Sequence, residues 1–286
     1  MLNNTKKIQV ALIVVLVLLT GFLFSRDIKV LEAKENPAEA SATADAAPEA
    51  PAITIEEASS TGKNLISNNL AKDITLLEGQ FKKASGEAKI DLAKKLSQKW
   101  DDVEQLIPSA LYLEYIATQK PSFEQWLKTG NQFQDAFETI TEDEVLQNAV
   151  LTKANHAFKE AIAIDSTNLE AKTGLGITIV NGLGAPMEGI RILQEVVESD
   201  PKNLKANTNL GIFAIKSGQF DKAITRFNNI IQNIKASPEA YFYLATAYES
   251  LDQKENAVEA YLNSKKLAAN PTLTKFIDQK VAELKK

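Results

Sequence analysis

Few side chains in this sequence could do chemistry together. There is no cysteine, and His156 is the only histidine among 286 residues. The lack of cysteine excludes disulfides, thiolate zinc sites, iron–sulfur clusters and cysteine nucleophiles, and one histidine excludes metal sites built from several histidines. His156 has the side chain of a general base, but no serine or cysteine motif lies near it in the sequence. We interpret it as a structural residue of a helix.

Two acidic clusters and one glycine-rich turn are the other candidates for a catalytic or cofactor site. Asp101-Asp102 and Glu142-Asp143-Glu144 supply adjacent carboxylates, but acidic residues at turns and helix starts also favour the positive end of a helix dipole. Gly182-Leu183-Gly184 resembles half of a nucleotide-binding loop, yet no strand precedes it and no third glycine follows. Trp100 and Trp126 are interpreted as packing residues. The sequence therefore predicts no enzyme, no metal ion and no cofactor.

The composition predicts an all-α protein. The chain is 44% hydrophobic and 24% charged, with a net charge of −5, and Gly and Pro are scarce beside Ala, Leu, Lys and Glu. Helix-forming residues therefore dominate. The mild acidity argues against nucleic acid as the partner, because there is no basic excess to neutralise phosphates.

The first residues predict a membrane helix. Ile8 to Phe24 (IQVALIVVLVLLTGFLF) is a 17-residue run without a charge. As a helix it would be about 26 Å long, near the lower limit for crossing a bilayer core. Lys6 and Lys7 precede the run, so the positive-inside rule places residues 1–7 in the cytoplasm and everything after the span, predicted over 8–25, outside it. The predicted location is the cell (inner) membrane, with the rest of the chain in the periplasm of a Gram-negative cell.

A cleaved signal peptide is the alternative. It also has a basic start and an apolar stretch, but its cleavage site needs small residues directly after that stretch. The chain instead has Leu23-Phe24-Ser25-Arg26-Asp27, and a small-x-small triplet such as Ala42-Thr43-Ala44 comes much later. An uncleaved anchor is favoured.

A flexible tether is predicted over residues 26–60. From about Glu32 to Ser60 the sequence is rich in Ala, Glu and Pro and lacks aromatic residues. Such a segment cannot bury enough apolar surface to compensate for its ordering entropy. About 30 flexible residues have an end-to-end distance of about 30 Å, which would hold a folded domain away from the membrane.

The second half of the chain repeats with a period near 34 residues. Leu175-Gly176, Leu210-Gly211 and Leu244-Ala245 are separated by 35 and then 34 residues. Each pair is followed at a similar distance by a small residue and, four residues later, by a larger one: Gly189 and Leu193, Ala223 and Phe227, Ala257 and Tyr261. This pattern predicts pairs of closely packed helices that must stack to bury their apolar faces.

These residues resemble the tetratricopeptide repeat (TPR). The stretch from Leu204 to Ile231 carries the family's residue types at its spacing: Ala206, Asn209-Leu210-Gly211, Lys216, Gly218, Phe220, Asp221, Ala223 and Phe227. The next unit keeps Ala240, Tyr241, Leu244-Ala245, Tyr248, Ala257 and Tyr261. Gly189 departs from the pattern, since the family usually has alanine there, and the turn before it is one residue too long.

The resemblance implies a right-handed α-α superhelix of helical hairpins. Its repeats would span 169–203, 204–237 and 238–270, with a degenerate repeat over 121–168 and a capping helix over 271–286. The degenerate unit carries Trp126, Gly130 and Phe133 and needs a lengthened second helix over Glu142 to Ile164. Residues 61–120 are expected to form extra helical hairpins, with helices over Asn64–Ala84, Glu87–Trp100 and Pro108–Ala117.

The resemblance also implies a site. In the family, residues of each first helix that face the concave groove contact a partner protein or peptide; here they are Thr173, Ile177, Val180, Thr208, Ile212, Ile215, Lys216, Phe242, Thr246 and Glu249. The alternative is that some of these residues pack against the extra N-terminal helices. The family's carboxylate clamp does not map, because Thr208 and Ile212 stand where it needs other polar or charged donors. Repeat packing is assigned to Leu175, Gly176, Leu210, Gly211, Ala223, Phe227, Leu244, Ala245, Ala257 and Tyr261.

The function expected from these features is a membrane-anchored scaffold or adaptor for protein partners, in envelope assembly or chaperone-linked work. Two alternatives stay open. One is a structural protein that assembles with copies of itself, and the other, less favoured, is an enzyme that uses the groove as a substrate cleft.

Overall fold

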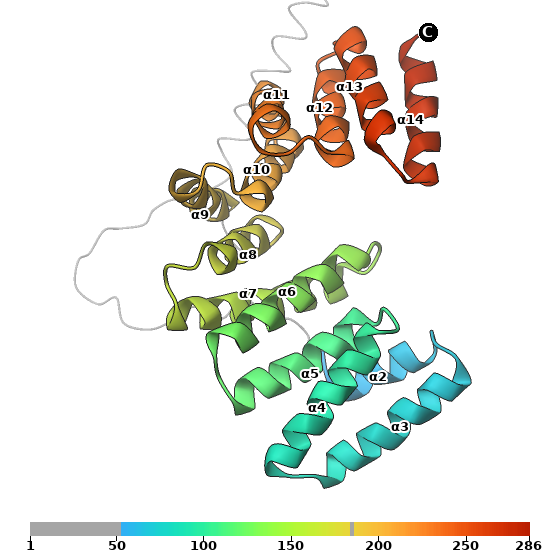
Figure 1. Ribbon diagram of the computed structural model, residues 1–286, viewed down its shortest axis with the longest axis vertical. Coiled ribbons are helices and arrows are strands. Elements are labelled where there is room, and N and C mark those ends of the chain that lie inside the picture. Colours follow the sequence, from blue (N-terminus) through green and yellow to red (C-terminus); the bar gives the residue numbers. More distant parts are fainter. Residues whose placement is uncertain (1–52, 184–185) are drawn as a thin grey trace, which may run out of the picture. The chain divides into compact units, whose positions relative to one another are not determined.

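The computed structural model describes residues 53–183 and 186–286, and these belong to one compact unit, Pro48–Lys286 (Figure 1). Within these ranges the chain is helical and contains no strand. The helices are α2 (Ile55–Lys63), α3 (Asn68–Lys83), α4 (Gly86–Asp101), α5 (Leu106–Gln119), α6 (Phe123–Thr139), α7 (Glu144–Ile164), α8 (Leu169–Val180), α9 (Pro186–Ser199), α10 (Leu204–Lys216), α11 (Phe220–Asn229), the π-helix η1 (Ile230–Ile234), α12 (Pro238–Ser250), α13 (Lys254–Leu267) and α14 (Pro271–Leu284).

The predicted membrane span, Ile8–Phe24, lies outside the described residues, as does the tether up to residue 52. Among the helices of residues 53–183 and 186–286, none is both long enough and apolar enough to cross a bilayer.

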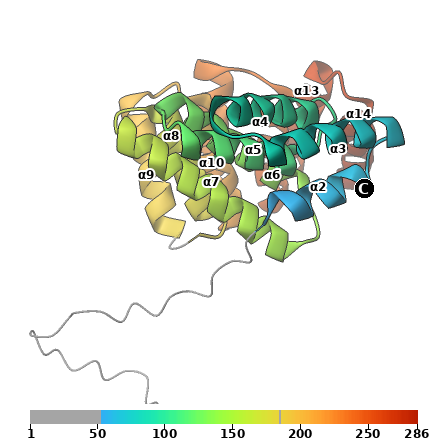
Figure 2. The same ribbon diagram turned by 90° about the horizontal axis from the view of Figure 1, so that it is seen from below.

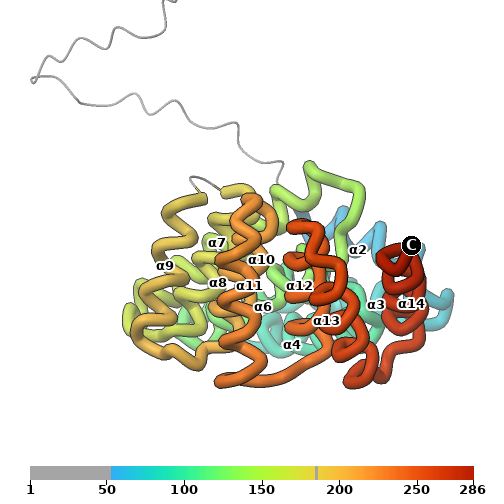
Figure 3. The backbone as a smooth tube through the Cα atoms, turned by 90° about the horizontal axis from the view of Figure 1, so that it is seen from above, coloured from blue at the N-terminus to red at the C-terminus, as the bar shows by residue number. Residues whose placement is uncertain are grey.

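The helices pack as consecutive hairpins. Each helix from α3 to α14 contacts the next one along the chain, and Figures 2 and 3 view the stack from the α3–α4 side and from the α13–α14 side. The first helices of successive hairpins, α6, α8, α10 and α12, also contact one another in that order. We call the surface of these four helices the first-helix face.

The end of the predicted tether is wrong. Residues 55–60 belong to α2, which the sequence analysis assigned to flexible chain. The helix starts with a capping box: the Glu57 backbone N–H donates to the Thr54 hydroxyl, and the Glu57 carboxylate accepts from the Thr54 backbone. On its inner side Ala58 and Gly62 are buried, and the Trp100 ring lies against Gly62.

The other N-terminal helices lie close to their expected positions, and the lengthened second helix expected over Glu142 to Ile164 is α7. Local capping fixes several of these ends. Asp143 accepts from the Leu146 backbone N–H at 2.9 Å at the start of α7. Ser237 does the same for Ala240 at 3.1 Å, with Pro238 as the first residue of α12.

Glycines let the paired helices approach closely. A Cβ atom at Gly174 would lie 2.2 Å from the Phe158 ring, and one at Gly211 would lie 2.6 Å from the Phe227 ring. Both rings are completely buried. The departure at Gly189 has the same cause: a Cβ atom there would lie 2.5 Å from the backbone oxygen of Gly176. At this crossing α8 and α9 meet backbone to backbone, so alanine does not fit.

Candidate interaction surface

The predicted groove residues do not form one open surface. Thr173 and Ile177 on α8 are only 1% and 3% exposed. Ile177 belongs to a hydrophobic cluster with Leu193, Ala206 and Leu210. The prediction that these two residues contact a partner is wrong, because both side chains are buried in a helix that contacts α6, α9 and α10.

Four other predicted groove residues are half-buried packing residues. Val180 packs against the cluster around Leu193, whereas Ile212, Ile215 and Phe242 pack against the C-terminal core. Phe242 has three aromatic neighbours, Tyr243, Tyr261 and Phe276, with ring centroids 5.7–5.9 Å away. Phe276 comes from α14, so the capping helix covers part of the surface assigned to a partner.

Glu249 holds the capping helix rather than standing free. Its carboxylate accepts from the Tyr261 hydroxyl at 2.7 Å and from Lys280 Nζ of α14 at 2.8 Å. Burial alone would raise the pKa of Glu249, but the hydrogen bonds from Lys280 and Tyr261 outweigh it and lower the pKa below its ordinary value. At a pH above the ordinary pKa of a glutamate, this contact therefore stabilises the folded state. Its contribution to stability is lost as the pH falls through the lowered pKa of Glu249.

The remaining three predicted groove residues differ in exposure. Lys216 is exposed, with Nζ 3.5 Å from Asn181 Oδ1 of the preceding hairpin. Thr208 and Thr246 are half-buried, and the Thr246 hydroxyl donates to the Phe242 carbonyl at 3.0 Å. The residues assigned to repeat packing are buried, apart from Leu175, which is half-buried.

On the first-helix face, and beside it at the end of α4, lies a group of carboxylates that the sequence pattern did not predict. We call Asp101, Asp135, Glu138 and Glu239 the acidic strip. They come from the end of α4, from α6 and from α12. Gln132 of α6 donates to Asp101 at 2.7 Å, and Lys205 of α10 donates to Gln134 of α6 at 3.4 Å. These long-range contacts bring residues of several hairpins together on one face.

The carboxylates of the strip affect one another. For Asp135, loss of surrounding water raises the pKa most, Lys205 opposes this, and Asp101 adds to it. For Glu138, loss of water again raises the pKa most, and the charges of Asp135 and Glu239 raise it further. Asp135 and Glu138 are exposed side chains, but the surrounding protein excludes part of the water around their carboxylates. At Glu138 two neighbouring carboxylates add repulsion, so a cation placed beside it would be stabilised.

We expect Glu138→Gln to make the protein more stable at pH 7. A raised pKa means that the ionised form is disfavoured in the folded state, so a neutral isostere removes that cost above the raised pKa. The gain should vanish well below the ordinary value of 4.5, where the carboxyl group is protonated in both states. Melting curves of this variant and of Glu198→Gln, an exposed glutamate on α9, would test this at both pH values. Equal changes in melting temperature for the two variants would contradict the effect of the surroundings on the Glu138 carboxylate.

The sequence of the degenerate repeat indicates that one strip residue, Asp135, occupies a groove position. Aligning Gly130 with Gly211 puts Asp135 at the position of Lys216. The groove residues were mapped only onto the three clear repeats, and so α6 was left out. The sequence does not indicate that Glu239 lies near Glu138. Their proximity depends on how α6 and α12 are placed across two intervening hairpins.

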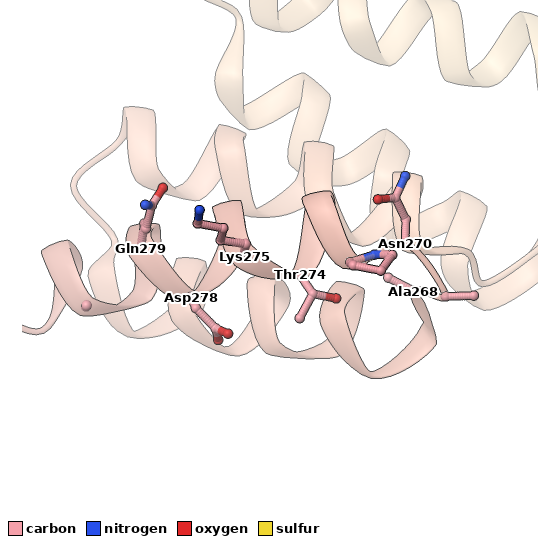
Figure 4. Close-up of a pocket in the computed structure, with 9 residues that line it drawn as sticks. Ala268, Asn270, Thr274, Lys275, Asp278 and Gln279 are labelled. Atoms are coloured by element: carbon pink, nitrogen blue, oxygen red, sulfur yellow. The ribbon is translucent and has the colours of Figure 1, made fainter.

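The catalytic alternatives gain no support from the geometry. His156 is exposed on α7, 3.7 Å from Glu160 Oε1 and edge-to-face with the Trp126 ring. Across residues 53–183 and 186–286 no group of three or more His, Asp or Glu side chains could hold a metal ion. Figure 4 shows a shallow pocket on α14 with Thr274, Lys275, Asp278 and Gln279. Its carboxylate, Asp278, pairs with Lys265 at 2.5 Å.

Comparison with known proteins supports the repeat assignment. Residues 238–271 match the tetratricopeptide repeat family, and no curated protein sequence matches the chain. The crystal structure of TTC0263, a thermophilic TPR protein of Thermus thermophilus, is similar over 68% of this chain and 99% of its own, at 13% identity and a TM-score of 0.52. The chain therefore has an all-α TPR fold.

Two further solved structures are less similar. YrrB, described as a TPR protein with an unusual peptide-binding site, aligns with 70% of this chain and 97% of its own at 17% identity and a TM-score of 0.45. A MamA structure aligns with 66% of this chain and 97% of its own at 19% identity and a TM-score of 0.46.

Proposed function

We propose that this TPR-fold protein is a membrane-anchored scaffold that binds a positively charged segment of a partner protein on its first-helix face. The observation that carries this proposal is the acidic strip. Asp135 and Glu138 lie on α6 and Glu239 on α12, and the charges of Asp135 and Glu239 both raise the pKa of Glu138. Lys205 lowers the pKa of both Asp135 and Glu138; its effect exceeds that of Asp101 at Asp135 but is smaller than that of Asp135 at Glu138.

A cationic partner suits this face for two reasons. The partly desolvated carboxylates interact more strongly with a lysine or arginine than fully hydrated ones do. The pKa of Tyr243, beside Glu239, is also raised, first by burial and then by the charges of Glu239 and Glu138. Its ring stacks on Phe227 and adds an aromatic surface beside the strip.

Charge removal tests this function. We expect residues 48–286 to bind a lysine- and arginine-rich synthetic peptide in a salt-sensitive manner, and Glu138→Gln with Glu239→Gln to weaken that binding by about tenfold or more. Glu198→Gln with Glu255→Gln, which removes the same charge from exposed sites on α9 and α13, is the matched control. Fluorescence anisotropy gives both affinities. If both double variants lost the same affinity for the peptide, the loss would come from the change in net charge alone. The strip would then be rejected as the binding surface.

The membrane anchor is part of the same proposal. The uncharged run Ile8–Phe24 would span the inner membrane, with the repeats outside the cytoplasm. Because α2 begins at Ile55, the tether would end at about residue 52 instead of residue 60.

We expect the protein to stay in the membrane fraction after a carbonate wash. A continuous apolar helix is held by the bilayer core, whereas carbonate releases peripheral proteins. N-terminal sequencing of the mature protein is the companion measurement. A mature N-terminus near residue 25 or 45 would show a cleaved signal peptide instead.

A further inference from the structure

A pocket lies where α2 meets the starts of α5 and α7 and the end of α6. It is a pocket of about 600 Å³. Apolar side chains supply much of its lining, among them Leu106, Ile107 and Pro108 from the start of α5 and Val145 and Leu146 from the start of α7. A space of this size accommodates one or two large apolar side chains of another molecule.

Two side chains at this pocket are unusually exposed for their type. Leu65, just after α2, is 70% exposed, and Val145 is 61% exposed. Large apolar side chains with such exposure beside an apolar pocket mark an interaction site more clearly than scattered ones do. The hydrophobic cluster beneath, which includes Ala58, Ala110 and Val150, is complete without them. The side chains of Leu65 and Val145 are therefore not part of this hydrophobic cluster.

The charge at the pocket has one sign. Glu57, Glu104 and Asp143 are among the lining residues, and no lysine or arginine is. Glu57 and Asp143 are held in place by the caps of α2 and α7, so their carboxylates are fixed on the rim. An occupant must therefore combine an apolar side chain with positive charge.

We propose that this pocket binds a cationic amphipathic segment of a partner protein, with an apolar side chain in the pocket and lysine or arginine side chains against Glu57, Glu104 and Asp143. The chain's own N-terminal residues are a poor occupant on charge. Residues 31–52 contain five acidic residues and a single lysine, and like charges at a docking site disfavour binding. The pocket is distinct from the acidic strip, because none of the four strip carboxylates lines it; Thr139, at the end of α6, is its one lining residue from a first-helix-face helix.

The test uses a labelled synthetic peptide of roughly four helical turns, with leucine at every third or fourth position and lysine between. Residues 48–286 include every described helix and hydrophobic cluster, so this fragment carries its own cores. We expect it to bind the peptide, and Leu65→Ser with Val145→Ser to weaken the affinity about tenfold or more. The control is Leu76→Ser with Ile164→Ser, which changes side chains 67% and 53% exposed away from the pocket. Melting curves confirm that both variants fold.

Several outcomes would overturn this proposal. Equal binding by the two double variants, or equal binding of a peptide with glutamate in place of lysine, would reject the site or its charge preference. Binding to the fragment but not to the full chain would show that the N-terminal residues occupy the pocket. Self-association in sedimentation that Leu65→Ser with Val145→Ser abolishes would identify a second copy as the occupant. Glu138→Gln with Glu239→Gln should leave peptide binding here unchanged, which separates this site from the acidic strip.

Discussion

Replacing Gly189 with alanine is expected to destabilise the protein by about 1–3 kcal/mol, although alanine is the residue the repeat pattern favours and the better helix former. The added Cβ atom would lie 2.5 Å from the Gly176 oxygen and 3.0 Å from the Val180 nitrogen. Both are backbone atoms, so no side-chain rotation relieves the contact. The α8–α9 pair must separate, and the core around Leu193 must loosen with it.

Urea unfolding of this variant measures the effect, and Gly79→Ala is its control. Gly79 lies in α3, and a Cβ atom there would meet nothing within 4 Å. Gly79→Ala should therefore be neutral or stabilise the protein by about 0.5–1 kcal/mol, as is usual for a helix interior. If Gly189→Ala matched this control, the close α8–α9 crossing would be absent in solution.

Changing Ile212 and Phe242 together to serine should lower stability by about 2–4 kcal/mol rather than only weaken partner binding. Both side chains pack on the C-terminal core, and Phe242 has ring contacts with Tyr243, Tyr261 and Phe276. Serine at these positions removes that contact area and the ring contacts of Phe242 with Tyr243, Tyr261 and Phe276. The contact between α12 and α14 should suffer most.

Thermal and urea unfolding test this, with hydrogen exchange in α14 as a local readout. Leu262→Ser with Leu267→Ser is the control, since both leucines lie on α13 and are 44% and 48% exposed. If the variant with serine at positions 212 and 242 unfolded at the wild-type temperature and urea concentration but no longer bound a partner, Ile212 and Phe242 would belong to an open groove instead of the core. Early unfolding with normal exchange in α14 would show that the Phe276 contact is unimportant.

Local sequence features were sufficient to predict most helices. The period of 34–35 residues and the capping residues, such as Ser237 with Pro238, depend on neighbours within a few turns, so they were accessible without tertiary structure. The same kind of signal, Thr54 followed by Glu57, was present at α2. The composition of residues 32–60 predicts flexible chain, but the cap at Thr54 is the feature that starts a helix there.

The repeat spacing by itself determined that helices pair and stack, but it did not determine which side chains of a first helix reach solvent. That depends on how closely successive first helices approach. Here Thr173 and Ile177 are buried in α8, which contacts α6, α9 and α10, and α14 engages Phe242 and Glu249. Likewise, only the tertiary structure brings Glu138 within reach of the charge of Glu239, about 100 residues away in the chain. Which helices pair is determined by residues on neighbouring helices. Which side chains are exposed, and which distant charges act on one another, depends on the geometry of several hairpins at once.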